Sequence, residues 1–121
     1  MNPSSRRMLI VDDEQLVCQG LEEYFGGKGY AITTAFSGEE ALSALTKDGP
    51  FDVLLLDIML PGIHGLEVLK RAKQLHPRAR VVIMTALDHG ELVESARANG
   101  ADAFIRKPFN LSDATWASAL A

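Results

Sequence analysis

Cysteine is almost absent from the sequence: the 121 residues include only one, Cys18. A single cysteine cannot form a disulfide within the chain. This low cysteine usage is typical of a reducing compartment, so we expect the protein to be cytoplasmic. Because Cys18 falls inside a helical pattern, a small buried apolar residue explains it better than a reactive thiol does.

Long hydrophobic runs and an excess of positive charge are also missing. No apolar segment is long enough to span a membrane, and residues 1–5 lack the pattern of a signal peptide, so we expect no membrane partner. Lysine and arginine together number 12, against 16 aspartates and glutamates, which gives a net charge of −4. This balance argues against a large nucleic-acid-binding surface in this chain.

The remaining composition is that of one globular domain. Hydrophobic residues make up 47% of the chain and charged residues 23%, and 121 residues are enough to bury a core. We therefore expect one domain spanning residues 1–121.

Short apolar segments alternate with helical patterns along the chain. The predicted strands cover residues 7–11, 30–36, 52–58, 80–86 and 103–106, and a helical pattern follows each of them. This alternation predicts a parallel sheet with helices on both faces, because right-handed crossovers wind the chain over each face in turn. The predicted fold is an α/β doubly wound five-stranded sheet, a flavodoxin-like (βα)5 with strand order 2-1-3-4-5.

Capping residues and breakers place the ends of the predicted helices. The first helix begins near Glu14 and ends at glycines 26 and 27, and the third carries an apolar stripe from Val68 to Leu75 before Pro77. The expected N-terminal caps of the second, fourth and fifth helices are Ser37 (with Glu40 in a capping box), Asp88 and Asn110.

Carboxylates gather where the first and third strands end. The segment VLLLD at 53–57 does not alternate, so it reads as a strand buried on both faces that ends in Asp57. The first strand ends in Asp12 and Asp13. If the two strands are neighbours, the three carboxylates converge, and they cannot all stay ionised without a cation. Oxygen ligands without a nearby histidine or cysteine cluster indicate Mg²⁺.

A hydroxyl and an ammonium follow the fourth and fifth strands. Thr85 and Lys107 flank the predicted acid site, and such a pair suits a phosphoryl group, for which Asp57 would be the nucleophile. Each of these residues alone also has an ordinary structural explanation. Thr85 could be a typical strand residue and Lys107 a solvated lysine, and either aspartate after the first strand could cap a helix. Their common position at strand ends favours the functional interpretation.

Four segments together resemble the receiver domains of two-component response regulators. They are LIVDDE at 9–14, DVLLLDIMLPGIHGLEVL at 52–69, VVIMTA at 81–86 and GADAFIRKPF at 100–109. The resemblance implies that Asp57 is the phosphoacceptor, that Asp13 binds Mg²⁺ directly and Asp12 largely through water, and that the backbone carbonyl of Met59 completes the ligands. It also implies that Lys107 pairs with the phosphoryl oxygens.

The resemblance further implies a switch and a set of partners. Thr85 would move to the phosphoryl group, Phe104 would turn inward, small Ala86 would leave the acceptor accessible, and the bond before Pro108 would be cis. The expected donor is a sensor histidine kinase or a phosphotransfer protein. The face built by the fourth helix, fifth strand and fifth helix would contact an output domain or a second copy of the chain.

Some residues depart from the pattern of the family. Ala103 replaces the acid that many regulators use in dimer contacts, so a homodimer of that type is less expected. Apolar Met59 and Leu87 cannot position a water, so we expect slow autodephosphorylation of a phosphoacceptor that is not otherwise an enzyme. The expected core is about 7–110, and residues 111–121 form a final helix that reads as truncated. Excision from a longer regulator or hybrid kinase is therefore preferred over a stand-alone protein.

Three other functions compete with the phosphoacceptor. A haloacid-dehalogenase-type phosphatase needs a second acid two residues after Asp57, where this chain has Met59. A flavodoxin-like nucleotide module needs phosphate-binding amides where this chain has the acids 12–14. A pseudo-receiver that binds partners without phosphorylation stays open as the alternative, although every chemical residue is present.

Overall fold

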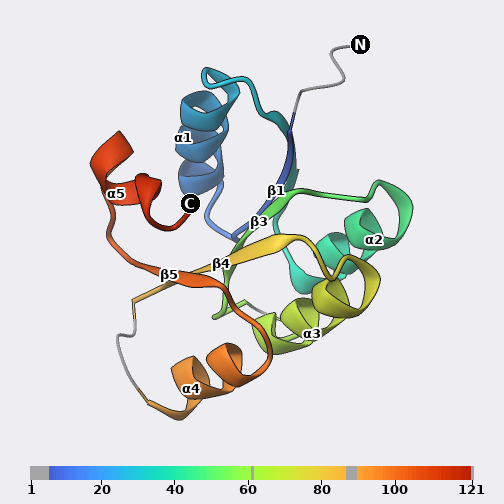
Figure 1. The fold of residues 1–121 in the computed structure, drawn as a ribbon. Coiled ribbons are helices and arrows are strands. Elements are labelled where there is room, and N and C mark those ends of the chain that lie inside the picture. The colour runs from blue at the N-terminus through green and yellow to red at the C-terminus, as the bar shows by residue number, and fades with distance from the viewer. Residues whose placement is uncertain (1–5, 61, 87–89, 121) are drawn as a thin grey trace.

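The computed structural model of the chain describes residues 6–60, 62–86 and 90–120, and strands and helices alternate along them (Figure 1). The elements are β1 (Arg7–Val11), α1 (Gln15–Gly26), β2 (Ala31–Ala35), α2 (Gly38–Lys47), β3 (Val53–Asp57), α3 (Gly65–Leu75), β4 (Arg80–Thr85), α4 (Glu91–Ala98), β5 (Ala103–Arg106) and α5 (Asp113–Ala117).

The sheet confirms the predicted topology. Its five strands are all parallel and lie in the order β2-β1-β3-β4-β5. Strand β1 therefore lies between β2 and β3. The strand order reverses there, which is where open sheets of this kind hold their sites.

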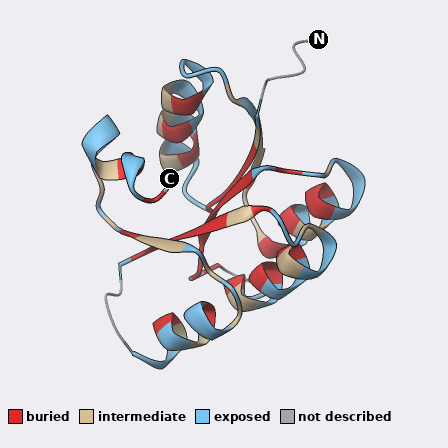
Figure 2. Ribbon diagram, viewed as in Figure 1, coloured by how far each residue is buried: buried red, intermediate tan, exposed pale blue. Residues whose placement is uncertain are grey.

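Two apolar cores lie on the two faces of the sheet. Successive strand residues point to opposite faces, so Leu54 and Leu56 of β3 face one core while Val53 and Leu55 face the other. Helices α2, α3 and α4 cover the first face, and α1 and α5 cover the second (Figure 1). The central strands are buried along their length, whereas the helices bury one side only (Figure 2). This double burial explains why β3 reads as a continuous apolar run.

The observed starts of α1 and α2 agree with those predicted from the sequence. Glu14 precedes α1, and Ser37 Oγ accepts a hydrogen bond of 3.1 Å from the Glu40 N–H at the start of α2. Glu40 Oε1 accepts the Phe36 N–H at 3.1 Å, so the reciprocal bond of the capping box reaches one residue further back. The Phe36 N–H is therefore used by the cap of α2. Strand β2 ends at Ala35, one residue earlier than predicted.

Three predictions about helices need correction or fall outside the structure. The cap of α5 is Ser112, whose Oγ accepts the Thr115 N–H at 3.3 Å, and Asn110 instead offers its carbonyl to the indole N–H of Trp116. Leu75, predicted to face inward, is 40% exposed because it lies in the last turn of α3, past the core. Asp88 lies outside the described residues, and the residue before α4 is Gly90.

Candidate functional site

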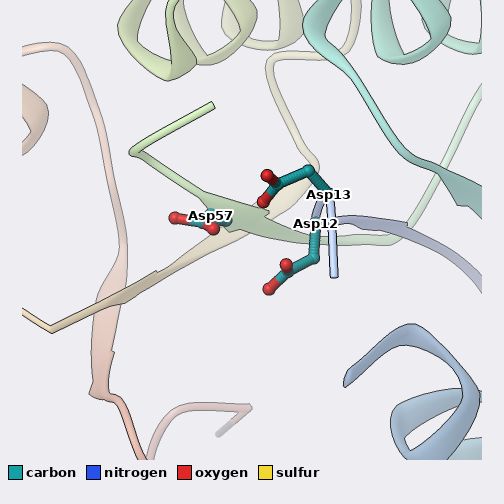
Figure 3. A group of neighbouring side chains, drawn as sticks. All are labelled: Asp12, Asp13 and Asp57. Atoms are coloured by element: carbon teal, nitrogen blue, oxygen red, sulfur yellow. The ribbon is translucent and has the colours of Figure 1, made fainter. Parts of the chain in front are cut away.

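The carboxyl ends of β1 and β3 bring three acids together. The ladder between the two strands pairs Val11 with Leu56, so Asp12 and Asp13 follow β1 at the level where Asp57 ends β3. One carboxylate oxygen from each of the three acids lies within 4.8 Å of the others. Figure 3 shows the three side chains as neighbours at this edge of the sheet. The predicted convergence is therefore present in the fold.

Backbone N–H groups hold two of these carboxylates in place. Asp12 Oδ1 accepts the Glu14 N–H at 2.9 Å, and Asp57 Oδ1 accepts the Met59 N–H at 2.9 Å. Asp12 is fully buried and Asp57 is 6% exposed, whereas Asp13 is exposed. The second oxygens of Asp12 and Asp57 are thus the ones left to face the site.

The ammonium group of Lys107 contacts several acids at the carboxyl edge of the sheet. Its Nζ lies 2.6 Å from Asp12 Oδ2, 3.2 Å from Asp57 Oδ2 and 3.4 Å from Glu14 Oε1. The Lys107 N–H donates to the Thr85 carbonyl at 2.7 Å, and the bond to Pro108 is cis. A second cis bond, Gly49–Pro50, was not predicted from the sequence.

Burial and charge act in opposite directions on the pKa values here. Burial raises the pKa of Asp57 above its ordinary value, and the Met59 hydrogen bond and the nearby Lys107 ammonium only partly offset this. Burial alone would lower the pKa of Lys107, but the Asp12 and Asp57 carboxylates hold it above its ordinary range. Lys107 is therefore a cation at neutral pH, and the ionised form of Asp57 is stabilised less in the folded protein than in water.

The donor set fits a hard divalent cation. All three candidate ligands are carboxylates, which suit Mg²⁺. Asp12 Oδ2 is buried and, among the described residues, has the charge contact with Lys107 but no hydrogen bond of normal geometry. A buried oxygen in that position is incompletely satisfied by the protein itself, and a cation in the acid cluster would supply the missing partner.

The loop after β3 depends on a close approach that only glycine allows. A Cβ atom on Gly65, at the start of α3, would lie 2.5 Å from the Ile58 carbonyl oxygen and 2.6 Å from its Cα. The contact brings α3 against the residues that directly follow Asp57. Gly65 therefore keeps in place the loop that contains Met59, whose side chain is 57% exposed.

The predicted switch residues occupy different surroundings. Thr85 is buried, Ala86 is exposed, and Phe104 is half-buried beside the core under α2, α3 and α4. The Arg97 guanidinium of α4 lies 4.8 Å from the centroid of the Phe104 ring. Phe104 therefore lies beside α4, and Ala86 lines a cavity with Lys107. Leu87 is outside the described residues.

Two residues near the site carry roles that sequence reasoning missed. Glu14 contacts Lys107, although the sequence marks it only as the third acid of a run and the start of a helix. Gly65 has no sequence signal for its close contact. Cys18 is buried as predicted, and its Sγ lies 3.3 Å from the Asp12 carbonyl oxygen. Burial raises the pKa of this thiol to about 11, so it stays protonated at neutral pH.

Comparison with known proteins identifies this arrangement. The profile of the response regulator receiver domain matches residues 8–117. The chain belongs to the receiver-domain family. Its strand order and its acid cluster at the ends of β1 and β3 are accordingly those of a response regulator receiver.

Curated relatives of this receiver differ in how much of them it covers. It is 45% identical over 105 residues to the DNA-binding transcriptional regulator NtrC of Klebsiella pneumoniae, which is 87% of the chain but 22% of NtrC. It is 37% identical over 109 residues to the sporulation initiation phosphotransferase F of Bacillus subtilis, which is 90% of the chain and 87% of that protein. The receiver thus spans about a fifth of the first relative and most of the second.

Solved structures share the fold of this receiver. A receiver domain protein from Methanospirillum hungatei is 32% identical with a TM-score of 0.85, over 92% of this chain and 88% of that one. A response regulator from Burkholderia pseudomallei is 26% identical with a TM-score of 0.87, over 97% and 67% of the two chains. That structure contains a phosphorylated aspartic acid and a calcium ion. In our receiver, no helix of the described residues is long and apolar enough to span a membrane.

Proposed function

We propose that this receiver accepts a phosphoryl group on Asp57 from a phosphohistidine of a sensor kinase or phosphotransfer protein, with Mg²⁺ bound. The observation that carries the proposal is the meeting of Asp57 with Asp12, Asp13 and Lys107 at one edge of the sheet. A relative named as a phosphotransferase and a related structure with a phosphorylated aspartic acid support it.

Asp57 and Lys107 have different roles in the transfer of the phosphoryl group. Asp57 Oδ1 is held by the Met59 N–H, so Oδ2, beside the Lys107 ammonium, is the oxygen free to attack phosphorus. As the new O–P bond forms, the P–N bond of the donor breaks and its electron pair stays on the imidazole nitrogen. Lys107 then lies next to the phosphoryl oxygens and offsets their charge.

Mg²⁺ would be held by Asp12, Asp13, Asp57 and the Met59 carbonyl, as the resemblance implies. When bound, it supplies positive charge that neutralises the transferring phosphoryl group. The acids also keep Lys107 charged and oriented before the donor arrives.

Exposed apolar side chains around the site suit a protein donor. Leu16 is 82% exposed at the start of α1, and Met59 is 57% exposed after β3. Val17 and Phe109 line a cavity beside Lys107. Large apolar groups clustered around a polar centre are typical of protein–protein contact.

The output follows from the switch residues that the family shares. Phosphorylation would draw Thr85 toward the phosphoryl group and turn half-buried Phe104 inward, changing the α4–β5–α5 face. An output domain or a second copy of the chain would bind this face. The protein acts as a signalling phosphoacceptor rather than as an enzyme.

A phosphoryl mimic tests the proposal without a kinase. Beryllium fluoride binds a carboxylate in the shape of a phosphoryl group, so with Mg²⁺ it should raise the unfolding temperature of the native protein more than Mg²⁺ alone. The Asp57→Asn variant should respond to Mg²⁺ and beryllium fluoride together no more than to Mg²⁺. Equal stabilisation of both proteins would contradict the site, and no response in either would favour the pseudo-receiver.

A further inference from the structure

Among the residues that the structure describes, Glu14 is the one carboxylate in contact with Lys107 that lies outside the acid triplet. Asp12 and Asp57 contact the ammonium and also belong to the candidate metal site, whereas Glu14 contacts it at 3.4 Å from the solvent side. Its side chain is 64% exposed. Glu14 therefore adds an exposed negative charge that contacts the same ammonium group as Asp57.

A cavity of about 410 Å³ opens between α1 and the segment after β5, beside the acceptor. Its walls are mostly apolar, and Glu14 and Lys107 are the only charged side chains among the described residues that line it. The lining residues are Glu14, Val17, Ala86, Lys107, Pro108 and Phe109. Lys107 lines this cavity and also lies 3.2 Å from Asp57 Oδ2, so the cavity adjoins the acceptor and has room for the leaving group of a donor.

The chemistry of the leaving group decides how it responds to Glu14. When a protonated phosphoimidazole transfers its phosphoryl group to Asp57, the P–N bond breaks, its electron pair returns to that nitrogen, and a neutral imidazole leaves. The second ring nitrogen keeps its N–H, which a carboxylate can accept as a hydrogen bond. When acetyl phosphate reacts, the P–O bond breaks and acetate leaves with a negative charge that the same carboxylate repels.

We propose that Glu14 is a specificity-determining residue that favours phosphodonors with an imidazole leaving group over donors with an anionic one. The proposal rests on the phosphoacceptor function of Asp57. It needs no movement of the fold, because Glu14, Lys107 and the cavity are already side by side.

The expected effects are modest because Glu14 is exposed to solvent. A partly screened charge contact changes a rate by about threefold, so removing it should slow transfer from phosphoimidazole about threefold and speed transfer from acetyl phosphate about threefold. The ratio of the two rates should then change about tenfold. A residue that only oriented Lys107 would change both rates in the same direction.

The experiment compares Glu14→Gln with the native protein and with Glu23→Gln, which removes a charge from α1, the helix that Glu14 precedes, far from the site. Each protein is incubated with phosphoimidazole or with acetyl phosphate at one Mg²⁺ concentration, and the phosphorylated fraction is followed by intact mass. The proposal expects opposite changes in the two rates for Glu14→Gln and no change for Glu23→Gln.

Changes of equal sign and size for the two donors, or no change, would overturn the role of Glu14 while leaving Asp57 as the acceptor. No adduct on the native protein with either donor would instead contradict the phosphoacceptor function, and the inference would fall with it.

Discussion

At the scale of single residues, the site contains an acid that the fold alone does not fully stabilise. Asp57 is almost completely buried, and within the described part of the chain it accepts a hydrogen bond from the Met59 N–H and contacts the Lys107 ammonium. Those contacts do not offset its burial, so its pKa is raised. An acid of this kind binds a cation readily because the cation relieves a cost already present in the folded state.

This imbalance predicts an unusual effect of Asp57→Asn on stability. Because the folded pKa lies above the unfolded value of about 3.8, the folded state holds the proton more tightly than the unfolded state does. The stability that the protonated form contributes is present at low pH and is lost as the pH rises through the folded pKa. Without Mg²⁺, Asp57→Asn should therefore be more stable than the native protein at pH 7.

Urea unfolding followed by the fluorescence of Trp116, the only tryptophan and a buried one, measures this difference. The advantage of the variant should shrink as the pH is lowered toward about 4. Adding Mg²⁺ should stabilise the native protein more than the variant. A variant that is less stable than the native protein at pH 7 without Mg²⁺ would show that Lys107 outweighs the burial of Asp57.

At the scale of elements, the β3–α3 loop holds the site against α3 through Gly65. A methyl group there would overlap backbone atoms of Ile58, which cannot move aside as a flexible side chain can. We expect Gly65→Ala to lower the free energy of unfolding by about 1–3 kcal/mol through overpacking. It should also weaken Mg²⁺ binding, because the displaced segment directly follows Asp57.

Gly26→Ala is the matched control for Gly65→Ala. Gly26 is the last residue of α1, and nothing lies within 4 Å of a Cβ atom built there. The same substitution should raise the free energy of unfolding by about 0.5–1 kcal/mol, because alanine loses less backbone entropy in a helix. Calorimetric Mg²⁺ titrations and urea unfolding of both variants check the pair. Equal effects on stability would remove the close contact as the cause.

Sequence patterns also work best at the element scale. The alternation of strands and helices predicted the sheet order, because crossover handedness leaves few arrangements. The predicted N-terminal cap of α5 was wrong because Asn110 and Ser112 are both residue types that favour this position. Which of the two caps the helix depends on how Trp116 packs against Phe25 and Phe109. The contact between Glu14 and Lys107 joins residues 93 positions apart, so only the folded sheet reveals it.

At the scale of the whole molecule, a rigid sheet carries a reactive edge. Apolar cores on both faces hold β1 and β3 in one register, and that register sets the spacing of the acids. The segments that we propose to change on phosphorylation lie at the carboxyl edge and along α4, β5 and α5. In this proposal, the sheet fixes the acceptor while a separate face changes.

The lifetime of the phosphorylated state is a property of this whole arrangement. Hydrolysis needs a water positioned for attack, and the exposed thioether of Met59 cannot position one. We predict a phosphoryl lifetime well beyond seconds at room temperature, shortened several-fold in Met59→Asn, whose amide can hold a water. Leu75→Asn, on the far end of α3, is the control. Decay of the native adduct within seconds would contradict the prediction.

Intact-protein mass after incubation with acetyl phosphate and Mg²⁺ tests the central claim most directly, with Asp57→Asn measured in parallel. The account predicts one phosphoryl adduct on the native chain, none on the variant, and none when EDTA removes Mg²⁺. A folded native protein that gains no adduct, or a variant that gains the same adduct, would contradict the assignment of Asp57 as the phosphoacceptor.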